Sequence, residues 1–265
     1  MSETANTFDG AIIDLRGVAK AYGAKQVLRD ATLAVRRGEV LVIMGGSGSG
    51  KSVTLRHMLG LEHPDAGEVF AFGEEISRYS ERELASVRMK FGMLFQSGGL
   101  FDSMTVFENV AFPLREHSDT AEDELARRVE EALAMVQLPG SGQLMPVDLS
   151  GGMRKRVGLA RAIVHHPQVI LYDEPTTGLD PITADKINEL IVDLQHRLEV
   201  TSIVVTHDIQ SAFYVGDRIA FLRDGVFEWT GTMDEARRNA PATLREFLVT
   251  SNVASAQPIE AGERR

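Results

Sequence analysis

One glycine-rich octapeptide constrains the fold of this chain more than any other stretch. It reads Gly45-Gly46-Ser47-Gly48-Ser49-Gly50-Lys51-Ser52 and fits the pattern G-x-x-x-x-G-K-[ST] at every fixed position. The apolar residues 40–44 before it predict a buried strand, and residues 52–59 after it predict a helix. This order of strand, loop and helix is the context that a phosphate-binding loop requires. The sequence therefore predicts a nucleotide-binding α/β domain.

The residue types in this loop suit phosphate chemistry. Glycines let the backbone turn tightly and point several N–H groups at phosphate oxygens, with the positive end of a helix dipole behind them. Lys51 would reach the terminal phosphates, and Ser52 would hold Mg²⁺. A merely flexible Gly/Ser loop would explain the glycines, but it would not explain a Lys-Ser pair at the start of a helix.

Composition excludes several classes of protein. The chain has 265 residues and no cysteine, so disulfides and thiolate metal sites are impossible. No apolar run approaches the roughly 20 residues of a membrane-spanning helix, and residues 1–10 lack the pattern of a secretory signal. A formal net charge of −10 argues against a protein whose main task is to bind nucleic acid. We therefore expect a globular protein without a nucleic-acid partner.

The order of the predicted elements divides the chain. Residues 11–20 and 26–35 predict two strands ahead of the phosphate-binding loop, and strands alternate with helices in the later part of the chain. The middle, about residues 97–152, is rich in helical patterns and is interpreted as a helical insert. We expect one domain over residues 11–250, and a disordered tail over the polar residues 251–265.

Three local predictions concern the middle of the chain. Pro113 is expected to end a short helix, and the stretch 140–142, Gly-Ser-Gly, is expected to close the amphipathic helix before it. The pair His165-His166 precedes a proline in what we expect to be an exposed loop. No further ligands lie near these histidines in sequence, so we predict no metal site there.

Two carboxylates follow an apolar strand. Asp173 and Glu174 come directly after residues 169–172, at the carboxyl edge where a parallel sheet delivers functional groups. Beside a phosphate-binding loop, Asp173 is suited to bind Mg²⁺ through its water shell, and Glu174 to polarise the water that attacks the γ-phosphate. The alternative is a strand-end pair that caps the next turn.

A second small-residue loop opens another helix. Ser150, Gly151 and Gly152 could hold phosphate through backbone N–H groups and the hydroxyl. Ser150 could equally be an ordinary N-cap. Spacing alone does not separate these two readings.

Together these motifs resemble one family, the ATP-binding subunits of ABC transporters. That family pairs the phosphate-binding loop with an L-S-G-G signature, a strand-terminal D-E, a D-loop and a switch histidine, and all are present here in the same order. The resemblance implies an α/β P-loop (RecA-like) core with an N-terminal antiparallel β-subdomain and an inserted α-helical subdomain. It further implies that Tyr22 stacks on adenine, Gln96 senses the γ-phosphate and Mg²⁺, Asp180 belongs to the D-loop, and His207 contacts the γ-phosphate. One departure is Met153, where the wider family often has Gln.

The resemblance also implies an assembly. In this family the signature of one subunit completes the ATP site of another, so a second copy is expected in a head-to-tail dimer. The expected activity is ATP hydrolysis with Mg²⁺, coupled to an integral membrane permease.

Within the family, three segments are similar to the subgroup that energises lipid transport in the Mla system, namely residues 95–116, 149–156 and 171–175. This implies phospholipid transport for outer-membrane lipid asymmetry, at the cytoplasmic face of the inner membrane as a peripheral subunit. The implied partners are a permease of the MlaE kind, an MCE protein of the MlaD kind and a STAS-domain protein of the MlaB kind.

Other members of the family remain as alternatives. An amino-acid importer or a lipoprotein exporter is the realistic second choice. Soluble ABC ATPases of DNA repair or of the ribosome are distant, because this sequence has neither long coiled-coil insertions nor a second cassette.

Two apolar groups are open to two interpretations each. Leu100, Phe101, Met104 and Phe107 could form a docking groove for a permease helix or fill the core of the helical insert. A face carried by Leu244, Phe247 and Leu248 could contact a STAS partner or pack on its own domain.

Overall fold

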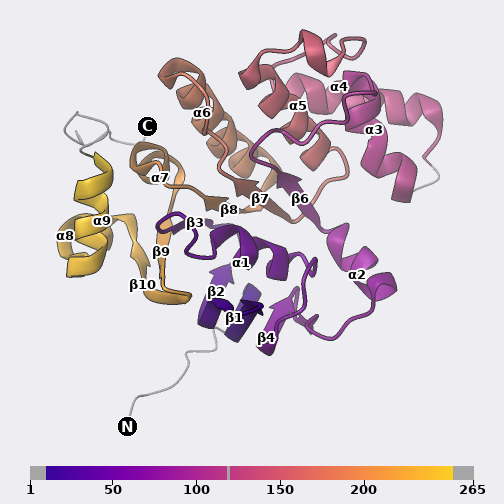
Figure 1. Ribbon diagram of the computed structural model, residues 1–265. Helices are drawn as coiled ribbons and strands as arrows, with labels where there is room; N and C mark the ends of the chain where they lie inside the picture. Colours follow the sequence, from indigo (N-terminus) through magenta and orange to yellow (C-terminus); the bar gives the residue numbers. More distant parts are fainter. Residues whose placement is uncertain (1–9, 118–119, 253–265) are drawn as a thin grey trace.

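The computed structural model describes residues 10–117 and 120–252, which form two sheets and the helices packed on them (Figure 1). Of the predicted tail, residues 253–265 lie outside the described residues, whereas residues 251 and 252 belong to the last helix. Among the residues described, none of the helices combines the length and the apolar character needed to cross a bilayer.

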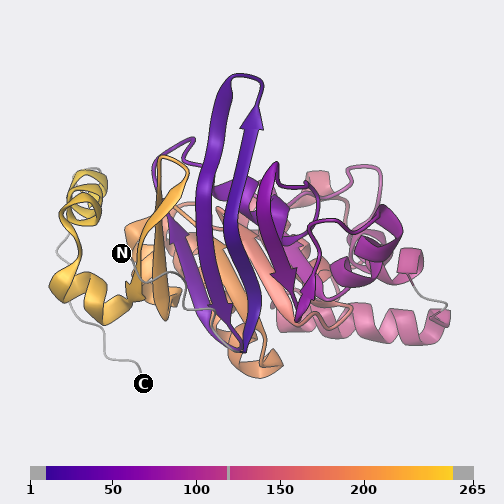
Figure 2. The same cartoon turned by 90° about the horizontal axis from the view of Figure 1, so that it is seen from below.

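The first sheet is antiparallel and is built mainly from the N-terminal part of the chain. Its strand order is β2-β1-β4-β5, and the long β1–β2 hairpin projects well beyond the rest of the sheet (Figure 2). Residues 12–15 of β1 are buried in an unbroken run, so both faces of the strand are covered there. The strands of this sheet are β1 (Ala11–Tyr22), β2 (Lys25–Arg36), β4 (Ala66–Ala71) and β5 (Glu74–Glu75).

The second sheet holds the phosphate-binding loop. Its order is β10-β9-β3-β8-β7-β6, with parallel pairing from β9 to β6 and an antiparallel β10 at the edge. The central strands are apolar on both faces, as expected for a parallel sheet covered on both sides. Its strands are β3 (Val40–Met44), β6 (Phe91–Leu94), β7 (Val169–Asp173), β8 (Thr201–Val205), β9 (Arg218–Arg223) and β10 (Val226–Thr232).

Strand β3 is shared by two hydrophobic cores. Leu41 and Ile43 face the core that also contains α1 (Lys51–Met58) and the antiparallel sheet. Val40, Val42 and Met44 face the other core, which the remaining helices cover. Helix α1 therefore lies between the two sheets (Figure 1).

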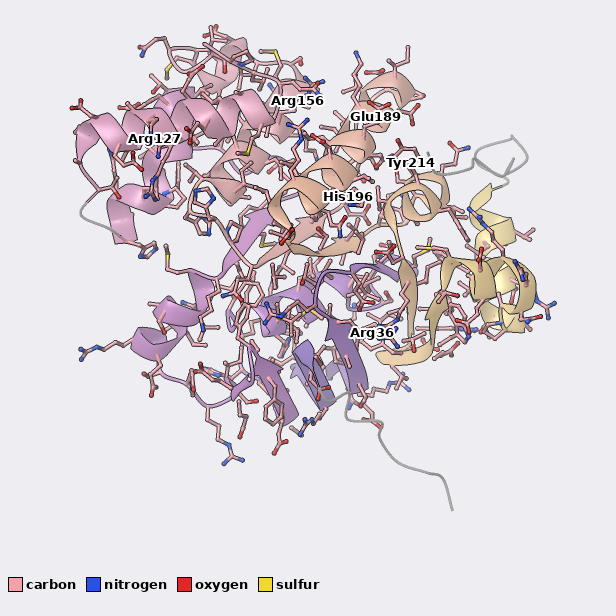
Figure 3. The ribbon with its side chains drawn as sticks, turned by 180° about the vertical axis from the view of Figure 1, so that it is seen from behind. Arg36, Arg127, Arg156, Glu189, His196 and Tyr214 are labelled. Atoms are coloured by element: carbon pink, nitrogen blue, oxygen red, sulfur yellow. The ribbon has the colours of Figure 1, made fainter. Side chains whose placement is uncertain are left out.

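The helices of the middle of the chain form a separate layer beyond β6 (Figure 1). Helix α5 packs on α3, α4, α6 and β6, so it joins this layer to the parallel sheet. On the outer side of α4, Arg127 points into solvent and pairs with Glu124 and Glu131 (Figure 3). The layer comprises α3 (Val106–His117), α4 (Glu122–Met135), the 3-10 turn η1 (Pro146–Asp148) and α5 (Gly151–Ile163).

Of the other helices, the first packs on the core around α1, and the other four pack on the core across β3. They are α2 (Glu81–Arg88), α6 (Pro181–Leu198), α7 (Ile209–Val215), α8 (Met233–Asn239) and α9 (Ala242–Asn252).

Two of the local predictions are wrong. Pro113 lies inside α3, which continues to His117, because Val110 and Leu114 on either side of the proline are buried and hold the helix against its neighbours. Helix α4 ends before the Gly-Ser-Gly stretch 140–142. Gln137 takes the left-handed conformation there, with φ 61°, and Leu138 N–H bonds to the Leu133 carbonyl.

A buried ion pair lies beside the turn between β2 and β3. Arg218 at the start of β9 donates two hydrogen bonds to the carboxylate of Glu39, at 2.9 and 3.0 Å, and both side chains are 9% exposed. The same carboxylate accepts the backbone N–H of Arg36 at 2.7 Å. These contacts fix the turn that leads from β2 into β3.

Candidate functional site

The loop between β3 and α1 depends on glycine for its path. A side chain at Gly45 would meet the Leu222 carbonyl oxygen at 2.2 Å, because the end of β9 runs against the loop. Gly48 and Gly50 have φ of 76° and 109°, in the region that favours glycine. Gly46 and Gly48 border open space. The loop therefore presents bare backbone to the cleft.

Lys51 is the first residue of α1, and its ammonium group bends back over the loop. Its Nζ donates to the carbonyl oxygens of Gly45 and Gly46, at 2.8 and 3.1 Å. Burial lowers the pKa of Lys51, and the nearby carboxylates of Glu174 and Asp173 oppose this shift. The side chain is thus held against the backbone of the loop, on the wall of the cleft.

Ser52 and Asp173 bring hard oxygen atoms together next to the phosphate-binding loop. The Ser52 hydroxyl donates to Oδ1 of Asp173 at 3.1 Å. Burial raises the pKa of Asp173, and the hydrogen bond from Ser52 counteracts it. A hydroxyl and a partly buried carboxylate facing a phosphate-binding loop are a donor set that Mg²⁺ prefers, so these residues fit that ion.

Glu174 lies at the end of β7 and faces His207 at the end of β8. The Nδ1 atom of His207 lies 2.8 Å from Oε2 of Glu174, and the Thr177 hydroxyl donates to the same oxygen at 3.0 Å. The backbone of Glu174 has φ 51°, a left-handed conformation that is unfavourable for a non-glycine residue. The side chain is therefore held by two partners rather than free in solvent.

Of these groups, Lys51, Ser52, Glu174 and His207 line one cleft of about 730 Å³, and Asp173 contacts it through Ser52. Most of the residues predicted to bind the triphosphate border it, and Gln96 closes it from the end of β6. The cleft is lined by Lys25, Val27, Gly45, Gly46, Ser47, Gly48, Gly50, Lys51, Ser52, Val53, Gln96, Glu174, His207 and Phe247.

Tyr22 and Ser49 are not among the cleft residues. The Tyr22 ring is 43% exposed at the tip of the β1–β2 hairpin, and its hydroxyl donates to Glu62. Its pKa is raised, mainly by burial of the hydroxyl and then by that hydrogen bond. The Ser49 hydroxyl is buried inside the loop, where a side chain on Gly45 would meet it at 2.7 Å.

The signature and the D-loop form a second group on the same chain. Ser150 caps α5, accepting the backbone N–H of Met153 at 3.2 Å, and Asp180 caps α6 in the same way through Thr183 at 3.0 Å. A side chain on Gly152 would meet Thr183 at 2.5 Å, and one on Gly151 would meet Leu179 at 3.4 Å. The two caps therefore pack on each other, and none of these residues lines the cleft.

Four cleft residues were not predicted from the sequence, and one of them, Val53, directly follows the predicted motif. Lys25 and Val27 on β2 follow the predicted turn closely, so their position next to Tyr22 was the available signal. Phe247 comes from α9, and its ring lies 5.3 Å from the ring of Phe221 on β9. Only the fold brings this C-terminal helix to the loop.

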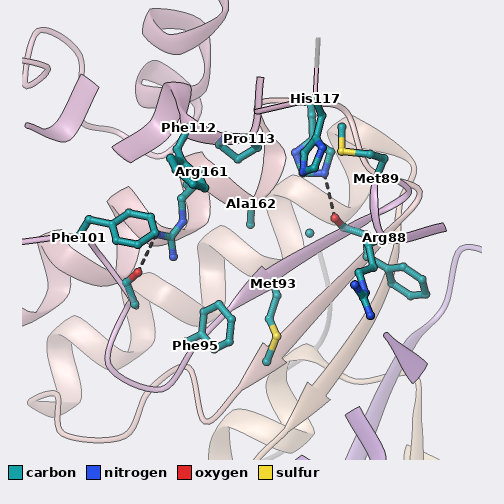
Figure 4. A pocket seen from close by; sticks show the side chains of 14 residues that line it. Arg88, Met89, Met93, Phe95, Phe101, Phe112, Pro113, His117, Arg161 and Ala162 are labelled. Atoms are coloured by element: carbon teal, nitrogen blue, oxygen red, sulfur yellow. Dashed lines mark hydrogen bonds between the residues drawn. The ribbon is translucent and has the colours of Figure 1, made fainter. Parts of the chain in front are cut away.

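The apolar residues after Gln96 divide between two surroundings. Leu100 and Phe107 pack on the core of the helical layer. Phe101 is 42% exposed, stacks on Phe112 with ring centroids 4.9 Å apart, and borders a groove of about 310 Å³ between α3, α5 and β6 (Figure 4). Arg161 reaches into this groove and donates to the Gly99 carbonyl at 2.6 Å (Figure 4).

Two further expectations concern surfaces. His165 is part-buried rather than exposed, with Nε2 2.9 Å from the Phe91 carbonyl oxygen, and the described residues contain no cluster that could hold a metal ion. Leu244 is fully buried, and Phe247 and Leu248 pack on the same core. The apolar face of α9 therefore packs within its own domain.

Comparisons of sequence agree with the geometry. A family model described as ABC transporter matches residues 28–177. Over 237 residues the chain is 40% identical to the intermembrane phospholipid transport system ATP-binding protein MlaF of Escherichia coli, covering 89% of this chain and 88% of MlaF. Over 239 residues it is 44% identical to the probable ribonucleotide transport ATP-binding protein mkl of Mycobacterium tuberculosis, covering 90% of this chain and 67% of mkl.

Solved structures agree as well. A dimeric post-hydrolysis structure of the ATP-binding cassette MJ0796, bound to ADP and Pi, superposes with a TM-score of 0.77 at 36% identity, over 83% of this chain and 98% of that chain. The structure of cbiO1 from Clostridium perfringens superposes with a TM-score of 0.80 at 28% identity, over 93% and 96%. The predicted P-loop α/β fold and the predicted family are both confirmed, and the chain belongs to the ABC transporter family as its ATP-hydrolysing cassette.

Proposed function

We propose that this cassette drives the movement of phospholipid across the cell envelope, as the ATPase subunit of a complex similar to the Mla system. The observation that carries the ATPase role is the convergence of Ser52, Asp173, Glu174 and His207 on one phosphate-binding loop. The lipid role is supported by the likeness to MlaF along nearly the full length of both chains.

The phosphate-binding loop would hold the triphosphate of ATP. Backbone N–H groups of the loop and the N-terminal end of α1 attract its negative charge, and Lys51 exchanges its two carbonyl partners for phosphate oxygens. Ser52, Asp173 and Gln96 would hold Mg²⁺, which neutralises charge on the phosphates when bound. Tyr22, once released from Glu62, would stack on the adenine ring.

Glu174 would act as the general base for hydrolysis. A water oxygen attacks the γ-phosphorus, the bond from that phosphorus to the bridging oxygen of ADP breaks, and Glu174 takes the proton of the water. His207 keeps this carboxylate in place through its 2.8 Å contact and donates to the γ-phosphate when it moves. Gln96, which also lines the cleft, would sense that phosphate.

The second group, Ser150 to Gly152 with Asp180, implies a partner. These residues lie outside the cleft of their own chain, so they can reach a nucleotide only in another copy. The dimeric arrangement of MJ0796 offers a geometry for such a head-to-tail pair. We therefore infer two composite sites, each built from the loop of one copy and the signature of the other.

The groove beside Phe101 suits a helix of a membrane permease. Its lining includes four phenylalanines and two methionines, together with two arginines and two histidines, and it lies next to the segment that follows Gln96. A change at Gln96 could thus reach the membrane subunit through this short segment. Docking there would keep the cassette at the cytoplasmic face of the inner membrane, with an MCE protein and a STAS-domain protein as further partners.

Transport of ribonucleotides is the second candidate, because the mycobacterial relative named for it is 44% identical. That likeness spans 67% of the relative, against 88% of MlaF. The more complete overlap favours phospholipid as the cargo.

Purification of the intact complex would test this proposal. The full chain, tagged and extracted with its native membrane, should bring down a permease and an MCE-domain protein. After reconstitution into liposomes the complex should move a fluorescent phospholipid in the presence of ATP, and Glu174→Gln should abolish that movement. Co-purification with a periplasmic amino-acid-binding protein, or ATP-driven movement of a labelled ribonucleotide instead of lipid, would contradict it.

A further inference from the structure

A buried cation lies beneath the carboxylates of the cleft. Lys155 is on α5, five positions after Ser150, and its residue is only 4% exposed. The neighbouring Arg154 is exposed, so the helix turns one of its three consecutive basic residues inward. Burial of an ammonium group is unfavourable unless it is hydrogen-bonded, so its partner is informative.

That partner is the backbone of Glu174. The Nζ atom of Lys155 donates to the Glu174 carbonyl oxygen at 3.0 Å. The same oxygen accepts the N–H of Thr177 at 3.3 Å, and the N–H of Glu174 donates to the Val205 carbonyl at 2.9 Å. Both polar groups of this one peptide residue are therefore occupied.

The contact coincides with an unfavourable backbone conformation. Glu174 has φ 51°, which a non-glycine residue keeps only where its surroundings hold it. The left-handed turn is what directs the Glu174 side chain back toward His207 and Thr177. A donor fixed on the carbonyl of that turn stabilises the orientation of the carboxylate.

The electrostatics of the site agree with this arrangement. Burial lowers the pKa of Lys155, and the carboxylates of Glu174 and then Asp173 oppose the shift. In the part of the chain that the structure describes, no carboxylate lies close enough to Lys155 to form an ion pair. The ammonium group therefore interacts electrostatically with the carboxylates of Glu174 and Asp173 and donates a hydrogen bond directly to the Glu174 carbonyl.

We propose that Lys155 is a positioning residue for ATP hydrolysis, which holds the Glu174 turn and links it to the helix that carries the signature. The proposal rests on the role of Glu174 given above. Because Ser150 is the N-cap of α5, engagement of the signature with nucleotide in a second copy reaches the Glu174 of its own copy through about one turn and a half of helix. Lys155 would thus connect the two composite sites.

The test compares three variants of the full chain. Lys155→Met keeps the length of the side chain and removes its charge and donors, whereas Lys155→Arg keeps both. Lys186→Met makes the same change at an exposed position of α6 and serves as the control. We expect kcat of Lys155→Met to fall about 10-fold or more while KM for ATP changes less than about 2-fold, because positioning acts on the chemical step.

Lys155→Arg should recover part of the lost kcat, and Lys186→Met should match the unmodified chain. If Lys155→Met shows no cooperative thermal transition, Lys155→Gln takes its place with the same expectations. Hydrogen exchange gives a second reading, since the Thr177 amide shares the Glu174 carbonyl and should exchange faster when Lys155 is replaced.

Failure of the positioning role of Lys155 can be told apart from failure of the proposed catalytic role of Glu174. A normal kcat and unchanged Thr177 exchange in a folded Lys155 variant would overturn the positioning role, while Glu174→Gln remained inactive. Full activity in Glu174→Gln would instead overturn the proposed function on which this role rests. A rise in the KM of Lys155→Met for ATP without a loss of kcat would also contradict the positioning role, because it would indicate that Lys155 acts in ATP binding.

Discussion

The imidazole of His207 and the carboxylate of Glu174 meet across the ends of two neighbouring strands, with Nδ1 and Oε2 2.8 Å apart. Strands β7 and β8 are parallel, with Asp173 paired to Val205, so each chain segment leaves the sheet at the same edge. The contact between His207 and Glu174 therefore follows from the pairing register of β7 and β8. It places a titratable ring against the carboxylate that we assign as the base.

Removal of the base should separate ATP binding from hydrolysis. We expect Glu174→Gln to lower kcat by about 10²–10⁴-fold, because the amide cannot accept the proton of the attacking water. ATP should remain bound, since the loop and Lys51 are untouched. Phosphate release and equilibrium binding of labelled ATP measure the two effects, and Glu189→Gln on the exposed side of α6 is the control (Figure 3). Turnover at the normal rate would show that another group is the base.

Phe101 offers a test of coupling to the membrane. We expect Phe101→Asp to abolish stimulation of the ATPase by its permease, because a charge in the apolar groove opposes docking. Basal activity should stay within about 2-fold, since Phe101 does not line the cleft. Leu61→Asp, which places the same charge at another exposed apolar site, should leave stimulation intact. Equal stimulation of both variants would rule out docking at this groove.

The buried pair of Arg218 and Glu39 should dominate the stability of the turn into β3. We expect Arg218→Met to lower the free energy of unfolding by about 3–5 kcal/mol, because it leaves a buried carboxylate without its partner. The double variant with Glu39→Leu should regain part of this loss. Urea denaturation followed by circular dichroism gives both values. A loss below about 1 kcal/mol in the single variant would show that water replaces the arginine.

His57 should make the domain sensitive to acid. It is 1% exposed, with Nδ1 2.8 Å from the Val53 carbonyl oxygen and Nε2 buried without a partner among the described residues. Burial is the main reason why its pKa is lowered, so the folded state keeps the ring neutral where the unfolded chain takes up a proton. This contribution is complete above the unfolded pKa of about 6.5 and is lost as the pH falls below it.

The measurement is the free energy of unfolding between pH 7.5 and pH 5. One such proton contributes a slope of up to about 1.4 kcal/mol per pH unit, and His57→Leu should remove that part. His196→Gln, at an exposed position, should leave the slope unchanged (Figure 3). Burial lowers the pKa of His165 too, so a residual slope in His57→Leu is expected. An unaltered slope would mean that His57 is protonated in the folded state.

Local chemistry in the sequence predicts the fold around the loop well. The glycines at 45, 48 and 50 occupy positions where backbone contact or positive φ excludes side chains, so the motif states a physical requirement. The turn between β9 and β10 likewise has positive φ at Asp224 and Gly225, residue types that favour such turns. These backbone conformations depend on residues that are adjacent in the sequence, so the sequence alone predicts them.

What escaped prediction depends on distant contacts. Pro113 remains helical because residues on both sides of it are buried, and Gln137 ends α4 without a glycine. Phe247 enters the cleft from α9, and Lys155 reaches Glu174 from another helix. No spacing rule relates position 155 to position 174, since only the packing of α5 on the sheet makes them neighbours.

The sharing of β3 between two cores has a consequence for how this cassette can change over time. Successive residues of the strand, such as Leu41 and Val42, belong to opposite cores, and the strand ends at the catalytic loop. A volume change on either side is therefore transmitted to the same short peptide. A substitution in β3 that compensates for a change in one core would also have to fit the other core. The five residues of β3 should therefore be replaced more slowly in evolution than residues of the helices that cover them.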